Sequence, residues 1–301
     1  MTVTKGANYG YYAVAFIDVL GQKEVFAGID RIPETEEDTS LRDKLLKAHI
    51  ETVIFIENFR KSFEGFFNAY TEGGKQKEKI PISKQGMYQE MTKCVLKHQR
   101  FSDCIQAYTP LQTEKYHTKA MGGVYGILVA CGEMLLLSLS NNKAFRAGID
   151  IGVGTEMDNS EIYGPALFNA YELESKIAQY PRIVVGDTLM NYLMSVSKED
   201  FTLPDQPKED LLACKDLASR CLRMIVRDMD GYPILDYLGD EFRRIDEHLS
   251  EDMKAKTDFI SKQAFLFIKR ELEKWRQNKN QKLAVRYLQI HNYFRARGFK
   301  D

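Results

Sequence analysis

Runs of residues typical of buried β-strands alternate along the chain with runs that have the periodicity of amphipathic helices. Residues 11–19 are almost all β-formers with few polar breaks, as in a strand that is covered on both faces. Residues 45–63 carry apolar side chains at spacings of three and four, which is typical of one face of a helix. The alternation predicts an α/β (α+β) domain over residues 8–239, in which one sheet is flanked by helices.

Shorter elements follow from periodicity, turn residues and caps. They are a strand at 101–108, a buried helix at 122–140, a strand at 145–153, a hairpin with its turn at 157–160 and its return arm at 161–164, a helix at 166–179 that Pro165 opens, a strand at 182–185, a helix at 187–196 with Asp187 as its N-cap, and a hairpin turned by Asp230 and Gly231.

Residues 240–301 are expected to form a helical extension that differs in charge from the rest of the chain. Residues 262–301 hold eleven Lys and Arg against three acidic residues, whereas the whole chain has 42 basic and 43 acidic residues and a net charge of -1. A near-neutral chain argues against a protein that coats nucleic acid. Two apolar stripes run along the extension, one through Phe265, Ile268, Leu272 and Trp275 and one through Leu283, Tyr287, Ile290 and Phe294.

Cysteine usage and hydropathy favour a cytoplasmic protein that does not bind a membrane. The five cysteines form no CxxC pair, which argues against a disulfide framework and favours a reducing compartment. The N-terminus opens no signal peptide, and the most apolar stretch, residues 124–139, is short and interrupted for a bilayer span. The five histidines are scattered along the sequence and predict no zinc site.

Two acidic residues, Asp18 and Asp103, are each predicted to lie at the end of a hydrophobic strand. Desolvating a carboxylate costs several kcal/mol unless a partner compensates for the loss of water. Two such acids that converge on a divalent cation would resolve this cost, since Mg²⁺ and Mn²⁺ prefer carboxylate and carbonyl oxygens. In the alternative reading, each acid caps a neighbouring helix or turn.

Several segments, in their order along the chain, resemble class III nucleotidyl cyclases. Residues 16–21 (FIDVLG) and 100–103 (RFSD) are similar to the two metal-binding segments of that family, and residues 161–164 (EIYG) and 170–175 (AYELES) to its following hairpin and helix. The closer resemblance is to the pyrimidine cyclases of bacterial Pycsar antiphage defence, to which residues 180–183, 227–231 and 286–292 are similar as well. The resemblance implies a ferredoxin-type sheet and a C-terminal helical extension.

The resemblance implies conversion of a nucleoside triphosphate into a 3',5'-cyclic monophosphate and pyrophosphate. Asp18 and Asp103 would hold two divalent metal ions, Mn²⁺ or Mg²⁺, with the Val19 carbonyl as a further ligand. The backbone N–H groups of Val19, Leu20 and Gly21, ahead of a helix from Gln22, would contact phosphate oxygens. Lys23 would add a phosphate contact, although a solvated first-turn lysine is an equal alternative.

Gln99 and Glu161 occupy the positions that read the base in purine cyclases, which carry other residues there. The amide of Gln99 can donate and accept, and the ionised carboxylate of Glu161 accepts, so the pair suits uracil or cytosine. The chemistry does not separate UTP from CTP. UTP is preferred because uridylate cyclases are expected to be the commoner members of the group, and cCMP formation from CTP is the alternative. Both residues could instead be ordinary surface positions of a hairpin.

Other positions depart from the purine cyclase pattern. Phe168 stands where that pattern has a ribose-orienting asparagine, so we take its neighbour Asn169 as the nucleotide-binding candidate. Glu172 stands at the position of the transition-state arginine and cannot stabilise negative charge, which makes Arg100 and Lys23 candidates for the missing cation. Arg146, on the strand at 145–153, is interpreted as structural.

The resemblance also implies partners. Class III sites form between two protomers, so a homodimer with shared active sites is expected, and a separate cyclic-nucleotide-binding effector would read the product. The basic extension could brace that dimer; binding of RNA or an acidic partner is the alternative use of its charge. A different class of function, a non-catalytic nucleotide-binding dimer, is motivated by Phe168 and Glu172.

Overall fold

The computed structural model describes residues 8–27, 29–35, 38–71, 81–101, 103–112, 116–157, 161–202, 207–247 and 250–300. Within these ranges, eight strands form one sheet with the order β2-β3-β1-β4-β6-β8-β7, and β5 pairs with β4 beside this path. The pairs are antiparallel except for β4 with β6. The strands are β1 (Asn8–Val19), β2 (Lys97–Phe101), β3 (Cys104–Pro110), β4 (Phe145–Met157), β5 (Glu161–Tyr163), β6 (Ile183–Val185), β7 (Ile225–Arg227) and β8 (Pro233–Leu235).

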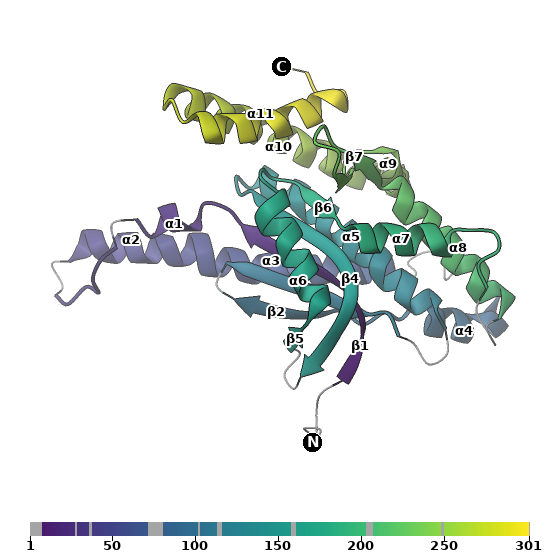
Figure 1. The fold of residues 1–301 in the computed structure, drawn as a ribbon. Coiled ribbons are helices and arrows are strands. Elements are labelled where there is room, and N and C mark those ends of the chain that lie inside the picture. The colour runs from purple at the N-terminus through teal and green to yellow at the C-terminus, as the bar shows by residue number, and fades with distance from the viewer. Residues whose placement is uncertain are drawn as a thin grey trace.

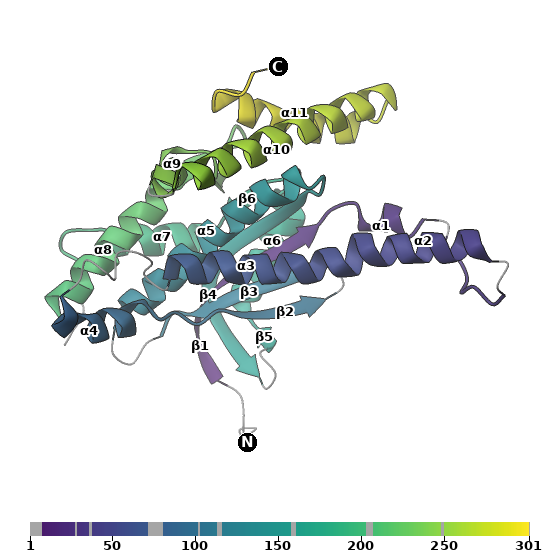
Figure 2. The same cartoon turned by 180° about the vertical axis from the view of Figure 1, so that it is seen from behind.

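Helices cover both faces of the sheet and confirm the mixed α/β prediction with a helical C-terminus. Helix α6 lies on one face in Figure 1, and α3 lies on the opposite face in Figure 2. The described helices are α1 (Gln22–Val25), α2 (Thr39–His49), α3 (Phe55–Thr71), α4 (Ile82–Thr92), α5 (Thr118–Ser140), α6 (Pro165–Glu172), α7 (Asp187–Val196), α8 (Lys208–Arg223), α9 (Asp240–Glu247), α10 (Glu251–Gln277) and α11 (Gln281–Ala296). Two π-helical segments, η1 (Ile50–Ile54) and η3 (Leu173–Ile177), continue α2 and α6.

Strand β1 is the central strand of the sheet and is buried on both faces. Because side chains alternate along a strand, Ala13 and Ile17 point to the face that α3 and α5 cover, where they join the main core. Val14 and Phe16 point to the opposite face and pack with Ala166 of α6. This two-sided burial explains why residues 11–19 are apolar throughout rather than at every second position.

Helix α5 is the principal core helix. It is longer than the apolar stretch 124–139 suggested, and by length and composition it could cross a membrane. However, 83% of its most apolar window is buried within the fold, as in a core helix. Two glycines allow neighbours to approach it closely. A Cβ atom at Gly123 would lie 2.5 Å from Thr109 Oγ1, and one at Gly126 would lie 2.7 Å from Thr71 Cγ2.

The C-terminal helices pack into the same core as the sheet. Phe265 and Ile268 of α10 and Phe294 of α11 are buried in one cluster with residues of α5. His291, on the apolar side of α11, is buried and stacks on Phe265 with 5.3 Å between the ring centroids. The apolar stripes of the extension are therefore covered within the chain itself.

Two local predictions were wrong. Residues 101–108 do not form one strand, because β2 ends at Phe101, Asp103 lies in a turn and β3 starts at Cys104. Asp187 is not the N-cap of α7: that position is Gly186, and the carboxylate of Asp150 accepts the Leu189 N–H at 2.8 Å. A side chain from β4 thus does the capping, which the sequence around α7 cannot reveal. The expected turn at 157–160 lies mostly outside the described residues.

Candidate functional site

Asp18 and Asp103 lie close together at one end of the central strands. Asp18 is the penultimate residue of β1, and Asp103 lies in the turn between β2 and β3. β1 pairs with β3 so that Asp18 is opposite Cys104, and the Val19 N–H donates to the Asp103 carbonyl oxygen at 3.3 Å. One ligand atom from each of Asp18, Asp103 and Cys104 lies within 4.8 Å of the other two. Strand pairing therefore gathers two acids that are far apart in the sequence.

Arg146 is a third member of this site, which the sequence interpretation had placed in a structural role. The register of β1 with β4 sets Arg146 opposite Asp18, so both side chains project from the same face of the sheet. Arg146 Nε and Nη2 donate to Asp18 Oδ2 at 3.2 and 3.0 Å. Arg146 Nε also lies 2.6 Å from Glu174 Oε1, so one guanidinium serves two carboxylates.

Glu174 is the most buried acid of the site. It lies in η3 and is 2% exposed. Burial raises the pKa of Glu174 to about 7; the Arg146 guanidinium opposes this shift, and the negative charge of Asp18 adds to it. Glu174 is the second glutamate of the AYELES segment, whose resemblance to the family's helix was the signal in the sequence that could have placed it in the site.

A glycine on β4 lets η3 reach this position. A Cβ atom at Gly148 would lie 2.2 Å from the Ala170 carbonyl oxygen and 2.8 Å from the Glu174 backbone nitrogen. Both are backbone atoms, so any side chain at Gly148 would push α6 and η3 away from the sheet. The alternation of small and large residues along β4 thus helps to set where Glu174 meets Arg146.

The donor atoms of the site fit a hard divalent cation. Among the side chains that the structure describes, none pairs with the Asp103 carboxylate. Burial, together with the negative charges of Asp18 and Asp103, raises the pKa of the Cys104 thiol to about 12. A thiol is also a soft donor, which suits hard cations poorly. The remaining donors are carboxylate oxygens, which Mg²⁺ and Mn²⁺ prefer.

The two predicted base-reading residues lie on neighbouring segments. Gln99 is on β2, Glu161 begins β5, and the Ile162 N–H donates to Gln99 Oε1 at 3.2 Å. This hydrogen bond occupies the amide oxygen of Gln99 and leaves its NH₂ group as the donor that a ligand could use. The Glu161 side chain is half-buried.

The candidate residues of α6 differ in exposure. Asn169 is half-buried, whereas Phe168 is 67% exposed. Glu172 is exposed and pairs with Lys176 one turn later, so its charge is engaged within the helix.

A tight turn follows Asp18 and contains Val19, Leu20 and Gly21, whose backbone N–H groups were predicted to contact phosphate. In the structure the Val19 and Leu20 N–H groups donate instead to carbonyl oxygens of Asp103 and Ala144, which leaves the N–H of Gly21 for that role. Gly21 has a φ of 85°, which favours glycine, and the Leu20 N–H donates to the Ala144 carbonyl oxygen at 2.9 Å. The helix that follows, α1, has only four residues. The side chains of Lys23 and Arg100 lie outside the described residues, so their predicted roles stay predictions.

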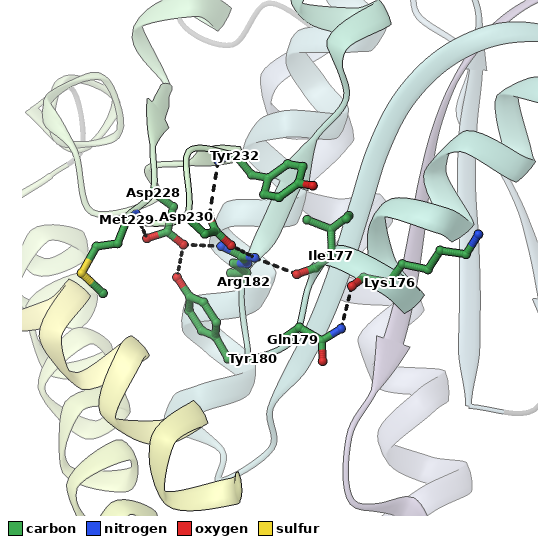
Figure 3. Close-up of polar contacts among 9 residues, drawn as sticks. All are labelled: Lys176, Ile177, Gln179, Tyr180, Arg182, Asp228, Met229, Asp230 and Tyr232. Atoms are coloured by element: carbon green, nitrogen blue, oxygen red, sulfur yellow. Dashed lines mark hydrogen bonds and ion pairs between the residues drawn. The ribbon is translucent and has the colours of Figure 1, made fainter.

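A buried ion cluster that the sequence interpretation missed supports the far end of η3 (Figure 3). Arg182 is 3% exposed and donates to Asp228, to Asp230 Oδ2 at 2.6 Å and to the Ile177 carbonyl oxygen at 2.7 Å. The Tyr180 hydroxyl donates to Asp228, and the Arg182 guanidinium lies 4.6 Å from the Tyr180 ring centroid. The segments 180–183 and 227–231, each singled out by resemblance, thus form one cluster that ties the β7–β8 hairpin to η3.

Comparison with known proteins gives a distant structural likeness. The sequence matches no protein-family model and no curated protein. Among solved structures, the chain is similar to the adenylyl cyclase CyaB from P. aeruginosa, with 16% sequence identity and a TM-score of 0.37. The match covers 76% of this chain and 93% of that chain. Because this likeness is distant, the function is inferred below from the residues of the site.

Proposed function

We propose that the protein is a metal-dependent nucleotidyl cyclase that converts UTP into 3',5'-cyclic UMP and pyrophosphate. The observation that carries the proposal is the convergence of the Asp18 and Asp103 carboxylates, within 4.8 Å of each other, beside the turn at Gly21. The resemblance to the pyrimidine cyclases of antiphage defence supports the same reaction and a role as a source of second messenger. A separate effector protein would bind the product.

Asp18 and Asp103 would hold the metal ions, with the Val19 carbonyl as a further ligand. Two bound divalent cations would lower the pKa of the ribose 3'-hydroxyl and neutralise negative charge on the triphosphate. Arg146 holds Asp18 from the side of β4, at 3.0 Å, and so orients one carboxylate before a cation binds. Glu174 holds Arg146 in turn, which makes both residues positioning groups rather than ligands.

Gln99 and Glu161 support a pyrimidine substrate. With its oxygen bonded to the Ile162 N–H, Gln99 offers an NH₂ donor, and Glu161 offers an acceptor. Uracil presents a carbonyl acceptor beside its N3–H donor, which this pair complements. Cytosine presents N3 as acceptor beside its amino donor, so CTP is the second substrate candidate and cCMP its product.

A homodimer with shared active sites is part of the proposal. Large apolar side chains are exposed on β5 and α6, namely Tyr163 (50%), Phe168 (67%) and Tyr171 (45%). These residues flank Asn169 and lie next along the chain to Glu161. A second copy that covers them would bury apolar surface and bring a second set of nucleotide-binding residues to each metal site.

The test is to incubate the purified protein with Mn²⁺ and each of the four nucleoside triphosphates in turn. We expect cyclic UMP from UTP, and Asp18→Ala and Asp103→Ala should each lower turnover by at least about 100-fold. Asp258→Ala, an exposed aspartate on α10, is the matched control and should turn over at the wild-type rate. Product from ATP or GTP alone would refute the pyrimidine assignment, and full activity in Asp18→Ala would refute the metal site.

A non-catalytic nucleotide-binding dimer is the second candidate. It is favoured by Glu172, which stands where the resembled family has its transition-state arginine. This candidate predicts binding of a triphosphate without release of pyrophosphate. A pyrophosphate-release assay on the same samples separates the two.

A further inference from the structure

A cavity of about 560 Å³ lies next to the turn that follows Asp18. Its wall includes the turn at Leu20 and Gly21, the residues Val25, Ala27 and Ile29, helix α2 with the start of η1, the residues just before β4, Pro181, and the C-terminal helices α10 and α11. The connection of α10 to α11 lies on the same side of the molecule as α1 and α2 in Figures 1 and 2. We call this space the basic cavity.

The basic cavity carries an excess of positive charge. Five basic side chains line it against two acidic ones, and they are Lys44, Lys47, Lys143, Lys274 and Arg286 against Glu51 and Glu271. Both acids are engaged locally: Glu51 lies 3.8 Å from Lys47, and Glu271 accepts from Lys274 at 3.2 Å and from the Trp275 indole at 3.1 Å. Among the described residues, no carboxylate pairs with Lys143 or Arg286.

We propose that the basic cavity holds the β- and γ-phosphates of the substrate, and then the pyrophosphate product, with Lys143 and Arg286 as phosphate-binding residues. The inference rests on the proposed function and assigns part of that site to the C-terminal helices. The ribose 3'-hydroxyl loses its proton to solvent as its oxygen bonds to the α-phosphorus. The bond from that phosphorus to the bridging oxygen breaks, and its electron pair leaves with pyrophosphate. Cations that contact pyrophosphate stabilise this charge as it develops.

The position of Arg286 supports this assignment. Its Nη2 donates to Gln179 Oε1 at 3.4 Å, just beyond the end of η3. Burial lowers the pKa of Arg286, and the positive charge of Arg146, which pairs with Asp18, lowers it further. The positive charge of Arg146 thus acts on Arg286 although Arg146 is itself paired with acids, and an anion bound in the cavity beside Arg286 would offset it.

The dimensions and lining of the cavity favour a small polyphosphate over a macromolecule. A volume of about 560 Å³ is that of a small-molecule pocket rather than of an extended surface. Phe267, Trp275 and Leu283 form its apolar part, which strengthens the attraction between the cations and a bound anion because less water screens them. A basic surface that binds RNA would instead be convex or extended and exposed.

The first experiment measures binding without turnover. The full chain in EDTA is titrated with pyrophosphate in a calorimeter, together with Lys143→Gln, Arg286→Gln and Arg276→Gln. Arg276 is exposed on α10 and does not line the cavity, so it controls for a lost positive charge on the extension. We expect each cavity variant to weaken pyrophosphate binding by about tenfold, and the control to bind as wild type does. Equal affinity in all four proteins would overturn the assignment.

The second experiment identifies the source of the phosphates. Pyrophosphate should inhibit turnover in competition with the triphosphate, and Arg286→Gln should raise KM by about tenfold. Noncompetitive inhibition would overturn the assignment to the phosphates of the substrate. If the protein has no cyclase activity but its pyrophosphate binding still depends on Arg286, the proposed function is refuted. The assignment of the cavity as a pyrophosphate site then remains.

Folding of the variants is checked separately. Arg286→Gln removes a cation whose burial is unfavourable in the free protein, so its thermal midpoint should match or exceed that of wild type. Arg286→Lys keeps the charge and should retain most of the pyrophosphate affinity. If Arg286→Lys bound as weakly as Arg286→Gln, the charge would not be responsible and the inference would fail.

Discussion

Arg146 should stabilise the free protein by pairing with two carboxylates that lie close together, Asp18 and Glu174. In Arg146→Met, Asp18 and Glu174 lose their shared guanidinium, while a side chain of similar length fills the space. The side chains of Arg146 and Asp18 are 20% and 19% exposed, and that of Glu174 is 3% exposed. Breaking a buried ion pair by removing one partner costs 3–5 kcal/mol, so for this partly solvated set we expect a loss of about 3 kcal/mol in the free energy of unfolding.

The assay is urea unfolding in EDTA, followed by circular dichroism, with a second substitution as the critical comparison. Glu174→Gln in the Arg146→Met background replaces the buried carboxyl group by a neutral amide and should recover most of the lost free energy. Without Arg146 that carboxyl group must be buried as an anion or take up a proton, and at neutral pH either one costs free energy. Arg276→Met, at an exposed site on α10, should change the free energy by less than about 0.5 kcal/mol. A double variant no more stable than Arg146→Met would refute the reasoning.

Three further predictions concern the surroundings of the site. Gly148→Ala should lower the free energy of unfolding by about 2 kcal/mol or more, since its Cβ would meet the Ala170 carbonyl oxygen at 2.2 Å; an unchanged urea midpoint would contradict this. Asp210→Ala should lower the free energy of unfolding by at least about 3 kcal/mol, because it leaves two backbone N–H groups at the start of α5 and the Thr118 hydroxyl without their acceptor. Asp216→Ala, which like Asp210 lies on α8, should lower it far less. Burial raises the pKa of Glu174 to about 7, above its unfolded value, so the stability that its protonated form contributes is present at low pH and is lost as pH rises through about 7. Glu174→Gln should flatten that part of the stability profile, and a profile identical to wild type would contradict the assignment.

Local sequence patterns predicted many of the strands and helices. The run of β-formers at 11–19, with few polar breaks, predicted a strand buried on both faces, and β1 has Val14 and Ile17 buried on opposite faces of the sheet. The spacing of three and four at 45–63 predicted a helix, which η1 and α3 form together with the end of α2. Such signals succeed because backbone preference and side-chain periodicity act within a few residues of the chain.

Local sequence patterns predicted only part of the candidate site. Asp18 and Asp103 could be named from their resemblance to metal-binding segments, but their proximity depends on the register of β1 with β3. The ion pairs of Arg146 were not predicted, because alternation along β4 tells which face a side chain occupies and not which residue lies opposite. That neighbour, Asp18, is set by strand pairing between distant segments.

By itself, the sequence determined many of the strands and helices, although not α4 or α8, together with the turn at Gly21 and the contrast between a near-neutral chain and its basic end. Only the tertiary structure decided what that basic end contacts. The apolar stripes of α10 and α11 bury Phe265 and Phe294 in the main core, and this packing carries Lys274 and Arg286 to the wall of a cavity beside Asp18. The physical reason is that periodicity specifies which face of a helix is buried, whereas the surface that covers it is chosen by packing among residues far apart in the chain.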